Sequence, residues 1–133
     1  MGYTIKFEKE LSITTQDVID SILCCEDGGF DYWCELCSNP DDYTAAKNRL
    51  VQAVEASMSP CYEDVLAEIM EHGGALTVYD REDDKDYELT MEKLMAGWKK
   101  HVEATGRDDI DDYDAADADS ILQLAVFGEV IYG

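Results

Sequence analysis

The sequence predicts a mostly helical α+β fold in a single domain, residues 1–133, with a small antiparallel sheet built on a hairpin near residues 75–89. Three observations predict it. Apolar residues recur at helical spacing in six segments. Residues 75–79 and 86–89 are instead strand-like, and the charged segment between them is suited to a turn. The chain has 133 residues, 46% of them hydrophobic, and only two prolines, which suits one domain without a linker.

The N-terminal part predicts a short strand followed by a helix. Residues 3–9 alternate apolar and polar side chains, as an edge strand does. Thr14 and Asp17 have the spacing of a capping box, in which each side chain accepts from the other residue's backbone N–H. The apolar positions that follow predict a helix that ends at the glycine pair 28–29.

Three more helices are predicted before the hairpin. The first would be short, with a buried aromatic face, because four side chains fall at i, i+3, i+4 and i+7: Phe30, Trp33, Cys34 and Cys37. Asn39 followed by Pro40 indicates the start of a second helix, whose apolar stripe continues to Met58. Ser59-Pro60 indicates a third, which Gly73 ends.

The hairpin separates these helices from the C-terminal part. Residues 75–79 and 86–89 are strand-like and are joined by a charged turn, residues 80–85. Thr90 is placed to cap the next helix, which Gly106 ends.

The C-terminal part predicts an acidic loop, one helix and a strand. Either Asp114 or Asp117 begins the last helix, which Gly128 ends. Residues 129–133 are suited to a final strand.

The dominant feature of the composition is acidity. The chain has 31 Asp and Glu against 10 Lys and Arg, a net charge of −21. Such a charge repels nucleic acid and anionic lipid, so we expect no direct binding to either, and it attracts basic surfaces. The commonest basic surfaces in a cell belong to nucleic-acid-binding proteins, which are therefore the predicted class of partner.

The chain shows no membrane or export signal. It has no run of 18 apolar residues, and its first residues carry Lys6, Glu8, Lys9 and Glu10 where a secretory signal would be apolar. Five cysteines, an odd number, suit reduced thiols. We therefore expect a cytoplasmic protein with no membrane partner.

No catalytic or cofactor motif is recognisable. Neither His72 nor His101 belongs to a nucleophile–base pattern, and the glycine pairs 28–29 and 73–74 suit helix ends better than a phosphate loop. We expect no enzymatic activity and no cofactor.

Two metal hypotheses are weaker than their structural alternatives. Cys34 and Cys37 form a CxxC, with Cys24 and Cys25 upstream, but the second pair is adjacent in sequence instead of forming another CxxC. Core packing of all four is the favoured interpretation, and a zinc or a redox site remains the alternative. The acidic run from Asp108 fits no register of an EF-hand calcium loop.

Two acidic segments are the predicted contact surface. The turn 80–85 and the loop 108–114 flank the predicted helix 91–105, so they can lie within one helix length, about 22 Å. Tyrosines would add contact area. The predicted partner-binding residues are Asp80, Glu82, Asp83, Asp84, Asp108, Asp109, Asp111, Asp112, Asp114, Tyr87 and Tyr113.

Three segments of the chain carry a resemblance. They are Gly28-Gly29-Phe30-Asp31-Tyr32-Trp33-Cys34; Gly73-Gly74 with Leu89-Thr90-x-x-Lys93-Leu94-x-x-Gly97; and Ala118-Asp119-x-Ile121-x-Gln123-x-Ala125-x-Phe127-Gly128-Glu129-Val130-x-x-Gly133. Together they resemble an uncharacterised group of small acidic proteins of prophages and mobile elements of gut bacteria. The similarity excludes residues 1–12 and the stretch near 38–60. These motifs are typical of core and turn positions.

The resemblance implies a context. Small acidic phage proteins are often inhibitors of bacterial defence, including anti-restriction and anti-CRISPR proteins, and several act as DNA mimics. The expected function is therefore inhibition of a host defence nuclease through an acidic, DNA-mimicking surface. The alternative is an adaptor that binds a host protein through an apolar groove lined by Trp33 and Phe30, with acids that only confer solubility. No functional residue is carried over from the group.

Overall fold

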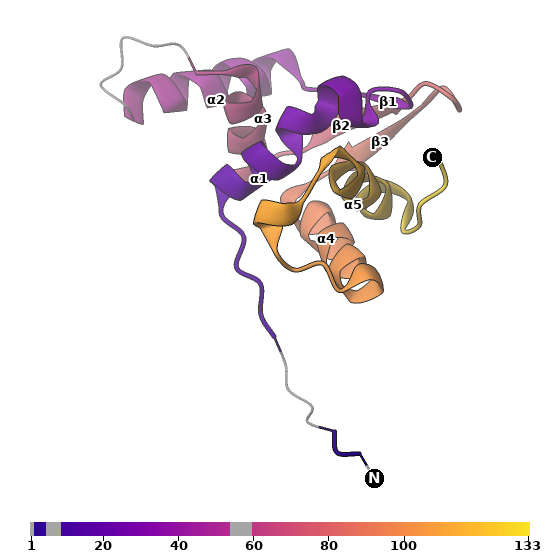
Figure 1. Cartoon of the computed structure of the whole chain (residues 1–133). Helices are drawn as coiled ribbons and strands as arrows, with labels where there is room; N and C mark the ends of the chain where they lie inside the picture. The colour runs from indigo at the N-terminus through magenta and orange to yellow at the C-terminus, as the bar shows by residue number, and fades with distance from the viewer. Residues whose placement is uncertain (1, 5–8, 54–59) are drawn as a thin grey trace.

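A computed structural model describes residues 2–4, 9–53 and 60–133 of the chain, and within them the predicted α+β fold is confirmed (Figure 1). The described residues form five α-helices and a three-stranded antiparallel sheet. None of the helices in this part of the chain is long and apolar enough to cross a membrane. The elements are α1 Thr15–Ser21, η1 Leu23–Cys25, η2 Glu26–Phe30, β1 Cys34–Cys37, α2 Pro40–Ala53, α3 Tyr62–Glu71, β2 Leu76–Asp80, β3 Lys85–Leu89, α4 Met91–Thr105, η3 Ile110–Asp112 and α5 Ala115–Phe127.

The sheet has the order β1-β2-β3, and it presents one face to the core and one to solvent. Residues of β2 alternate between buried and half-buried side chains, and the same alternation runs through β1. Leu36, Val78 and Leu89 point into the core. The predicted hairpin is confirmed as β2 and β3, with Val78 opposite Tyr87.

The prediction of a short helix over residues 30–37 was wrong. Phe30 and Trp33 are fully buried as expected, but they lie in η2 and the turn that follows it, and Cys34–Cys37 is strand β1. Pairing with β2 stabilises the extended conformation, with Leu36 opposite Val78. Phe30, Trp33 and Cys34 are buried at helical spacing, but the next buried side chain is Leu36, two residues on, as in a strand, and Cys37 is only half-buried.

The first helix begins as predicted and ends early. Thr14 Oγ1 accepts the backbone N–H of Asp17 at 3.1 Å, and the Asp17 carboxylate accepts that of Thr14 at 2.9 Å. The helix ends at Ser21 and not at the glycine pair 28–29, because the chain turns through η1 and η2. Gly28, with a φ of 80°, makes the turn inside η2 that L side chains rarely adopt.

The next two helices differ in how well they follow their predicted starts: α2 begins at its predicted signal, and α3 begins later than predicted. Asn39 Oδ1 accepts the backbone N–H groups of Asp41 and Asp42, which caps α2. Helix α3 begins at Tyr62, three residues after the predicted Ser59, and the Asp64 carboxylate accepts the N–H of Cys61 there. The predicted end of the α2 stripe falls on residues 54–59, which lie outside the described residues.

Helices α4 and α5 pack closely side by side and carry the acidic loop between them (Figure 1). Thr90 caps α4 as predicted, and Asp114, of the two predicted candidates, caps α5. Gly97 lies at the crossing: a Cβ there would come within 2.4 Å of the Ala125 backbone nitrogen. Only glycine allows the two backbones to approach this closely.

The predicted C-terminal strand is wrong, because residues 129–133 form no strand. A side chain takes the place of a neighbouring strand there. Gln123 Oε1 accepts the backbone N–H groups of Ile131 and Tyr132 at 2.9 and 2.8 Å, and its Nε2 donates to the Tyr132 carbonyl at 3.1 Å. The predicted N-terminal strand lies partly on residues 5–8, outside the described residues, and Tyr3, Thr4 and Lys9 are not in a strand.

Two of the three motif segments contact each other in the fold. The Asp119 carboxylate accepts from Tyr32 Oη at 2.6 Å and from Trp33 Nε1 at 2.8 Å. Trp33 also packs against Phe127 and Tyr132, with ring centroids 5.2 and 5.5 Å apart. These motifs therefore join the first third of the chain to α5 and the tail, as core determinants do.

Candidate functional site

The acidic hairpin turn is organised by an aspartate at its base. Asp80 has no exposed surface, and its Oδ1 accepts the backbone N–H groups of Glu82 and Asp83. Its Oδ2 accepts from Tyr132 Oη at 2.8 Å. The prediction that Asp80 contacts a partner was wrong, because a fully buried carboxylate that already has three donors is not available to one.

The remaining turn carboxylates are exposed and partly neutralised. Glu82, Asp83 and Asp84 all face solvent. Lys85 lies 3.9 Å from the Asp83 carboxylate, and Tyr79 Oη donates to Asp84 at 2.6 Å. A cation beside the turn lowers the negative potential that a basic partner would meet.

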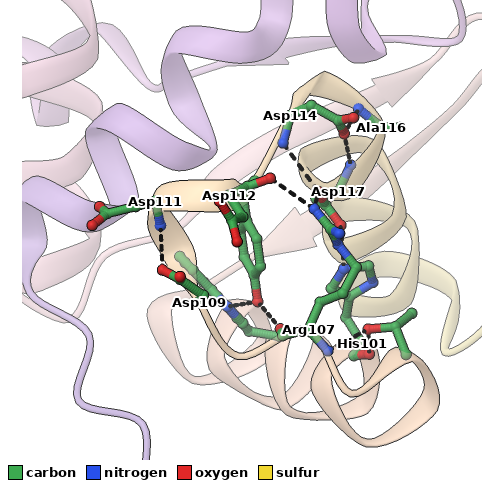
Figure 2. A network of polar contacts seen from close by, with 11 residues as sticks. His101, Arg107, Asp109, Asp111, Asp112, Asp114, Ala116 and Asp117 are labelled. Carbon is green, nitrogen blue, oxygen red and sulfur yellow. Dashed lines mark hydrogen bonds and ion pairs between the residues drawn. The ribbon is translucent and has the colours of Figure 1, made fainter.

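The second acidic segment is held by an ion pair between the exposed Arg107 and the buried Asp117 (Figure 2). Arg107 donates from Nε and Nη2 to the two carboxylate oxygens of Asp117, at 2.9 and 2.8 Å. The same Nη2 donates to the Asp112 carbonyl at 2.7 Å. Asp117 also lies 2.8 Å from His101 Nε2 and accepts the backbone N–H of Asp114. The loop between α4 and α5 is thereby tied to the first turn of α5.

The charge of Asp117 is stabilised at this position. Burial alone would raise the pKa of its carboxyl, but the hydrogen bonds from Arg107, the Asp114 backbone and His101 outweigh burial and lower this pKa to about 2. Arg107 in turn has a raised pKa because Asp117 accepts its hydrogen bonds. At neutral pH both groups are therefore charged, and the two hydrogen bonds between them join opposite charges.

This pair has a consequence for the loop around it, because Arg107 is the only Lys or Arg from residue 101 to the last residue. Among the described residues, its guanidinium forms an ion pair with Asp117 and with none of the carboxylates of the loop 108–114 (Figure 2). The loop therefore presents negative charge with little compensation.

The loop carboxylates divide by their roles, and all of them belong to exposed residues: Asp108, Asp109, Asp111, Asp112 and Asp114. Asp109 Oδ1 accepts the Asp111 N–H, and Asp114 Oδ1 accepts two N–H groups of α5. Asp108 lies 3.6 Å from Lys9. Among the described residues, no ion pair is formed by Asp111 or Asp112, which makes these two the most available for a partner.

The two tyrosines predicted to add contact area, Tyr87 and Tyr113, are half-buried and contact other parts of the fold. Tyr87 packs edge-on against Phe127, with ring centroids 5.1 Å apart. Tyr113 accepts from Trp98 Nε1 and donates to the Arg107 carbonyl. Both rings act mainly in packing.

The two acidic segments lie apart in the fold. The turn is at the distal end of the hairpin, so the whole of β3 separates it from the start of α4. Figure 1 shows the hairpin end and η3 at separate places, with α5 between them in this view. The turn 80–85 therefore does not adjoin α4, whereas the loop 108–114 follows it, and the expectation that the two lie within one helix length stays a prediction.

The cysteines do not form the uniform core group that we predicted. Cys34 is buried, Cys25 and Cys37 are half-buried, and Cys24 is exposed. Cys34 and Cys37 are three residues apart on one strand, so their side chains point to opposite faces of the sheet. Among the described residues, no three Cys, His, Asp or Glu side chains gather in a way that could hold a metal ion.

The predicted groove lined by Trp33 and Phe30 is absent from the described surface, because both side chains are fully buried. A different apolar depression, of about 470 Å³, lies between residues 9–13 and α4, where Met95, Trp98 and Val102 contribute to its wall.

Comparison with known proteins gives no relative: no family model, no curated protein and no solved structure matches this chain.

Proposed function

We propose that this protein binds a basic, nucleic-acid-binding surface of a host defence protein, such as a CRISPR effector or a restriction enzyme, and inhibits it by competing with nucleic acid. The observation that supports this most is the acidic loop between α4 and α5. It carries four exposed carboxylates in five residues, at Asp108, Asp109, Asp111 and Asp112.

The local density of charge favours this loop over the rest of the surface. A surface of 8406 Å² shared by 31 acidic residues gives about one per 270 Å². Duplex DNA carries about one phosphate per 110 Å² of its outer cylinder, so an even spread is too sparse to replace it. Only a cluster reaches a comparable density, and the loop is a cluster of this kind.

The Arg107–Asp117 pair makes the loop a better ligand. Two hydrogen bonds to Asp117 and one to the Asp112 carbonyl hold the loop before any partner arrives. A loop that is already ordered loses less conformational entropy on binding. Carboxylates then take the places of phosphates on the basic surface, and the counterions of that surface are released.

The direct test reverses the charge of the two least engaged carboxylates. The double variant Asp111→Lys with Asp112→Lys should abolish inhibition of the target nuclease, because neither carboxylate holds the loop. The matched control is Glu71→Lys with Glu129→Lys, which changes the net charge equally at two exposed positions elsewhere. Equal inhibition by the two double variants would contradict the proposal.

The target is to be identified by affinity capture. Tagged protein is incubated with nuclease-treated lysate of a host that carries a defence system, and bound proteins are eluted with duplex DNA. Recovery of a defence nuclease that DNA displaces supports competition with nucleic acid. A partner that DNA cannot displace would contradict it.

The adaptor alternative retains one supporting observation, the apolar depression beside α4. Salt distinguishes the two functions. Binding through the acidic loop should weaken steeply as the salt concentration rises, whereas binding through an apolar groove should change little.

A further inference from the structure

The two edge strands of the sheet, β1 and β3, differ in which side chains hydrogen-bond their outward backbone groups. At the β1 edge, the backbone N–H of Leu36 donates to the Glu26 carboxylate at 2.8 Å, and the Leu36 carbonyl accepts from Tyr62 Oη at 3.0 Å. Side chains therefore occupy the groups that another strand would need. The β1 edge is closed to pairing.

At the β3 edge, the hydrogen-bond pattern of the sheet shows which residues have outward backbone groups. The N–H of Arg81 donates to the Trp33 carbonyl at 2.8 Å, which places the odd-numbered residues of β2 on the side of β1. Val78 and its even-numbered neighbours then face β3, where Val78 pairs with Tyr87. The backbone groups of Asp86 and Glu88 must consequently point away from the sheet.

One contact agrees with this deduction. Lys93 Nζ donates to the Glu88 carbonyl at 3.3 Å and lies 3.6 Å from the Glu88 carboxylate. Both side chains are about half-exposed or more, so displacing this contact costs little free energy. Among the described residues, one exposed side chain, Lys93, contacts the outward backbone groups of β3. At β1, the side chains of Glu26 and Tyr62 both hydrogen-bond the outward backbone groups of Leu36.

The side chains along the edge indicate what kind of strand it accepts. Asp86 and Glu88 are exposed and lie on the solvent face of the sheet, while Tyr87, on the other face, is half-buried. Residues directly opposite on neighbouring strands contact each other, and opposite charges there are favourable. A strand with basic residues toward Asp86 and Glu88 and an apolar residue beside Tyr87 would match the edge.

A second copy of the chain does not match it. Antiparallel pairing of two β3 edges would bring Asp86 and Glu88 of one copy against the same acids of the other, and like charges opposite each other are destabilising.

We propose that the β3 edge, with which no other described strand pairs, binds an extended segment of a partner protein in which basic and apolar residues alternate, by adding it to the sheet as a fourth strand. Main-chain hydrogen bonds supply affinity in this mode, and alternate side chains supply specificity. The inference does not rest on the proposed function, because this edge is separate from the loop between α4 and α5.

The test uses a defined probe, the blocked peptide Thr-Lys-Val-Lys-Val-Lys-Thr, titrated into ¹⁵N-labelled protein. The amides of Asp86 and Glu88 should shift and become protected from hydrogen exchange, while the same peptide with Glu in place of Lys should bind far more weakly. Unchanged exchange at both amides, or equal binding of the two peptides, would overturn the proposal.

Two variants separate backbone pairing from simple charge attraction. Glu88→Pro removes an N–H that points out of the sheet, a position where an edge strand tolerates proline, and Glu88→Gln removes only the charge. The proline variant should bind the peptide about fivefold more weakly than the glutamine variant, the effect of one hydrogen bond. Equal affinities would show that only charge matters and would overturn the proposal.

Folding of the proline variant is to be checked by circular dichroism. If it fails to fold, Asp86→Pro and Asp86→Asn provide the same comparison at the other outward residue, and the exchange result in the unaltered protein stands alone. Sedimentation of the protein without peptide tests whether a second copy of the chain binds at the β3 edge. A dimer that Glu88→Pro abolishes would assign the edge to a second copy and overturn the proposal.

Discussion

Asp117, in the first turn of α5, receives both hydrogen-bonding arms of Arg107, whose Nε and Nη2 lie 2.9 and 2.8 Å from its carboxylate oxygens. The same carboxylate contacts His101, which α4 contributes. One buried charge therefore joins two helices and the loop between them.

Replacing Asp117 by Asn should destabilise the fold. The isosteric amide can still accept the Asp114 N–H, but it leaves Arg107 without its counter-charge. The lowered pKa of about 2 corresponds to a cost of about 2 kcal/mol in the free energy of unfolding, measured by urea denaturation at pH 7. Lys99→Ala is the control, because Lys99 and Glu103 form an exposed pair at 3.8 Å and its loss should cost less than about 0.5 kcal/mol.

The same pair predicts a pH dependence. The folded state lowers the pKa of Asp117 to about 2, so its stabilising contribution is complete above the ordinary pKa of 3.8 and is lost as the pH falls toward 2. The difference in unfolding free energy between the unaltered protein and Asp117→Asn should therefore be constant above about pH 5 and shrink toward pH 2. A difference that stays constant over the whole range would contradict this assignment.

Replacing Tyr132 by Phe should destabilise the hairpin turn. The variant removes one of three donors to the buried Asp80 carboxylate, and a buried charged acceptor that loses a donor is destabilised, so the melting temperature should fall. Tyr79→Phe is the matched control, because Tyr79 Oη donates to the exposed Asp84, and its loss should lower the melting temperature less. Equal losses in thermal unfolding would show that the burial of Asp80 has no energetic effect.

Alkaline pH gives a second measurement on Tyr132. Burial and the hydrogen bond to Asp80 raise its pKa to about 12. Its contribution is therefore complete below the ordinary pKa of 10 and is lost as the pH rises toward 12. The stability of the unaltered protein should approach that of Tyr132→Phe over this range, and parallel curves would contradict the expectation.

Gly97→Ala should be strongly destabilising. The added methyl group would lie 2.4 and 2.7 Å from backbone atoms of Ala125, so α4 and α5 must separate, at a cost of about 3 kcal/mol or more. Gly106→Ala is the control, because a Cβ there meets open space and only the φ of 72° is strained, which costs about 1 kcal/mol. Similar melting temperatures for the two variants would contradict the close contact of the helices.

Thiol labelling should distinguish the cysteines. Cys24 and Cys61 are exposed and should react with an alkylating reagent in the folded protein. Cys34 is fully buried, and burial raises the pKa of its thiol far above the ordinary value, so it should react only on unfolding. Peptide mapping by mass spectrometry identifies the labelled residues, and rapid labelling of Cys34 would contradict its place in the core.

The sequence was a good guide wherever the determinant is local. Thr14, Thr90 and Asp114 cap helices through N–H groups two or three residues away, and those contacts can be predicted from spacing alone. Strand β1 could not be predicted in this way. Its conformation depends on pairing with β2, about forty residues later, and Cys34 and Cys37 happen to continue the helical spacing of Phe30 and Trp33.

Only part of the candidate site could be predicted from the sequence, for a similar reason. The exposed acids of the loop between α4 and α5 were apparent from composition. The burial of Asp80 depends on Tyr132, 52 residues away, and nothing near Asp80 in the sequence indicates it. The Arg107–Asp117 pair was missed, although one signal was present: a single base directly before a long acidic run suggests a structural counter-ion.

The way Gln123 holds the tail limits which substitutions the C-terminal residues can accept over time. Its amide contacts the main chain of Ile131 and Tyr132, which every residue except proline provides in the same form. Val130 and Ile131 are about half-exposed, so drift at these two positions should be nearly neutral. Selection should instead act on Gln123 and Tyr132, because the first orders the tail and the second connects it to the hairpin turn.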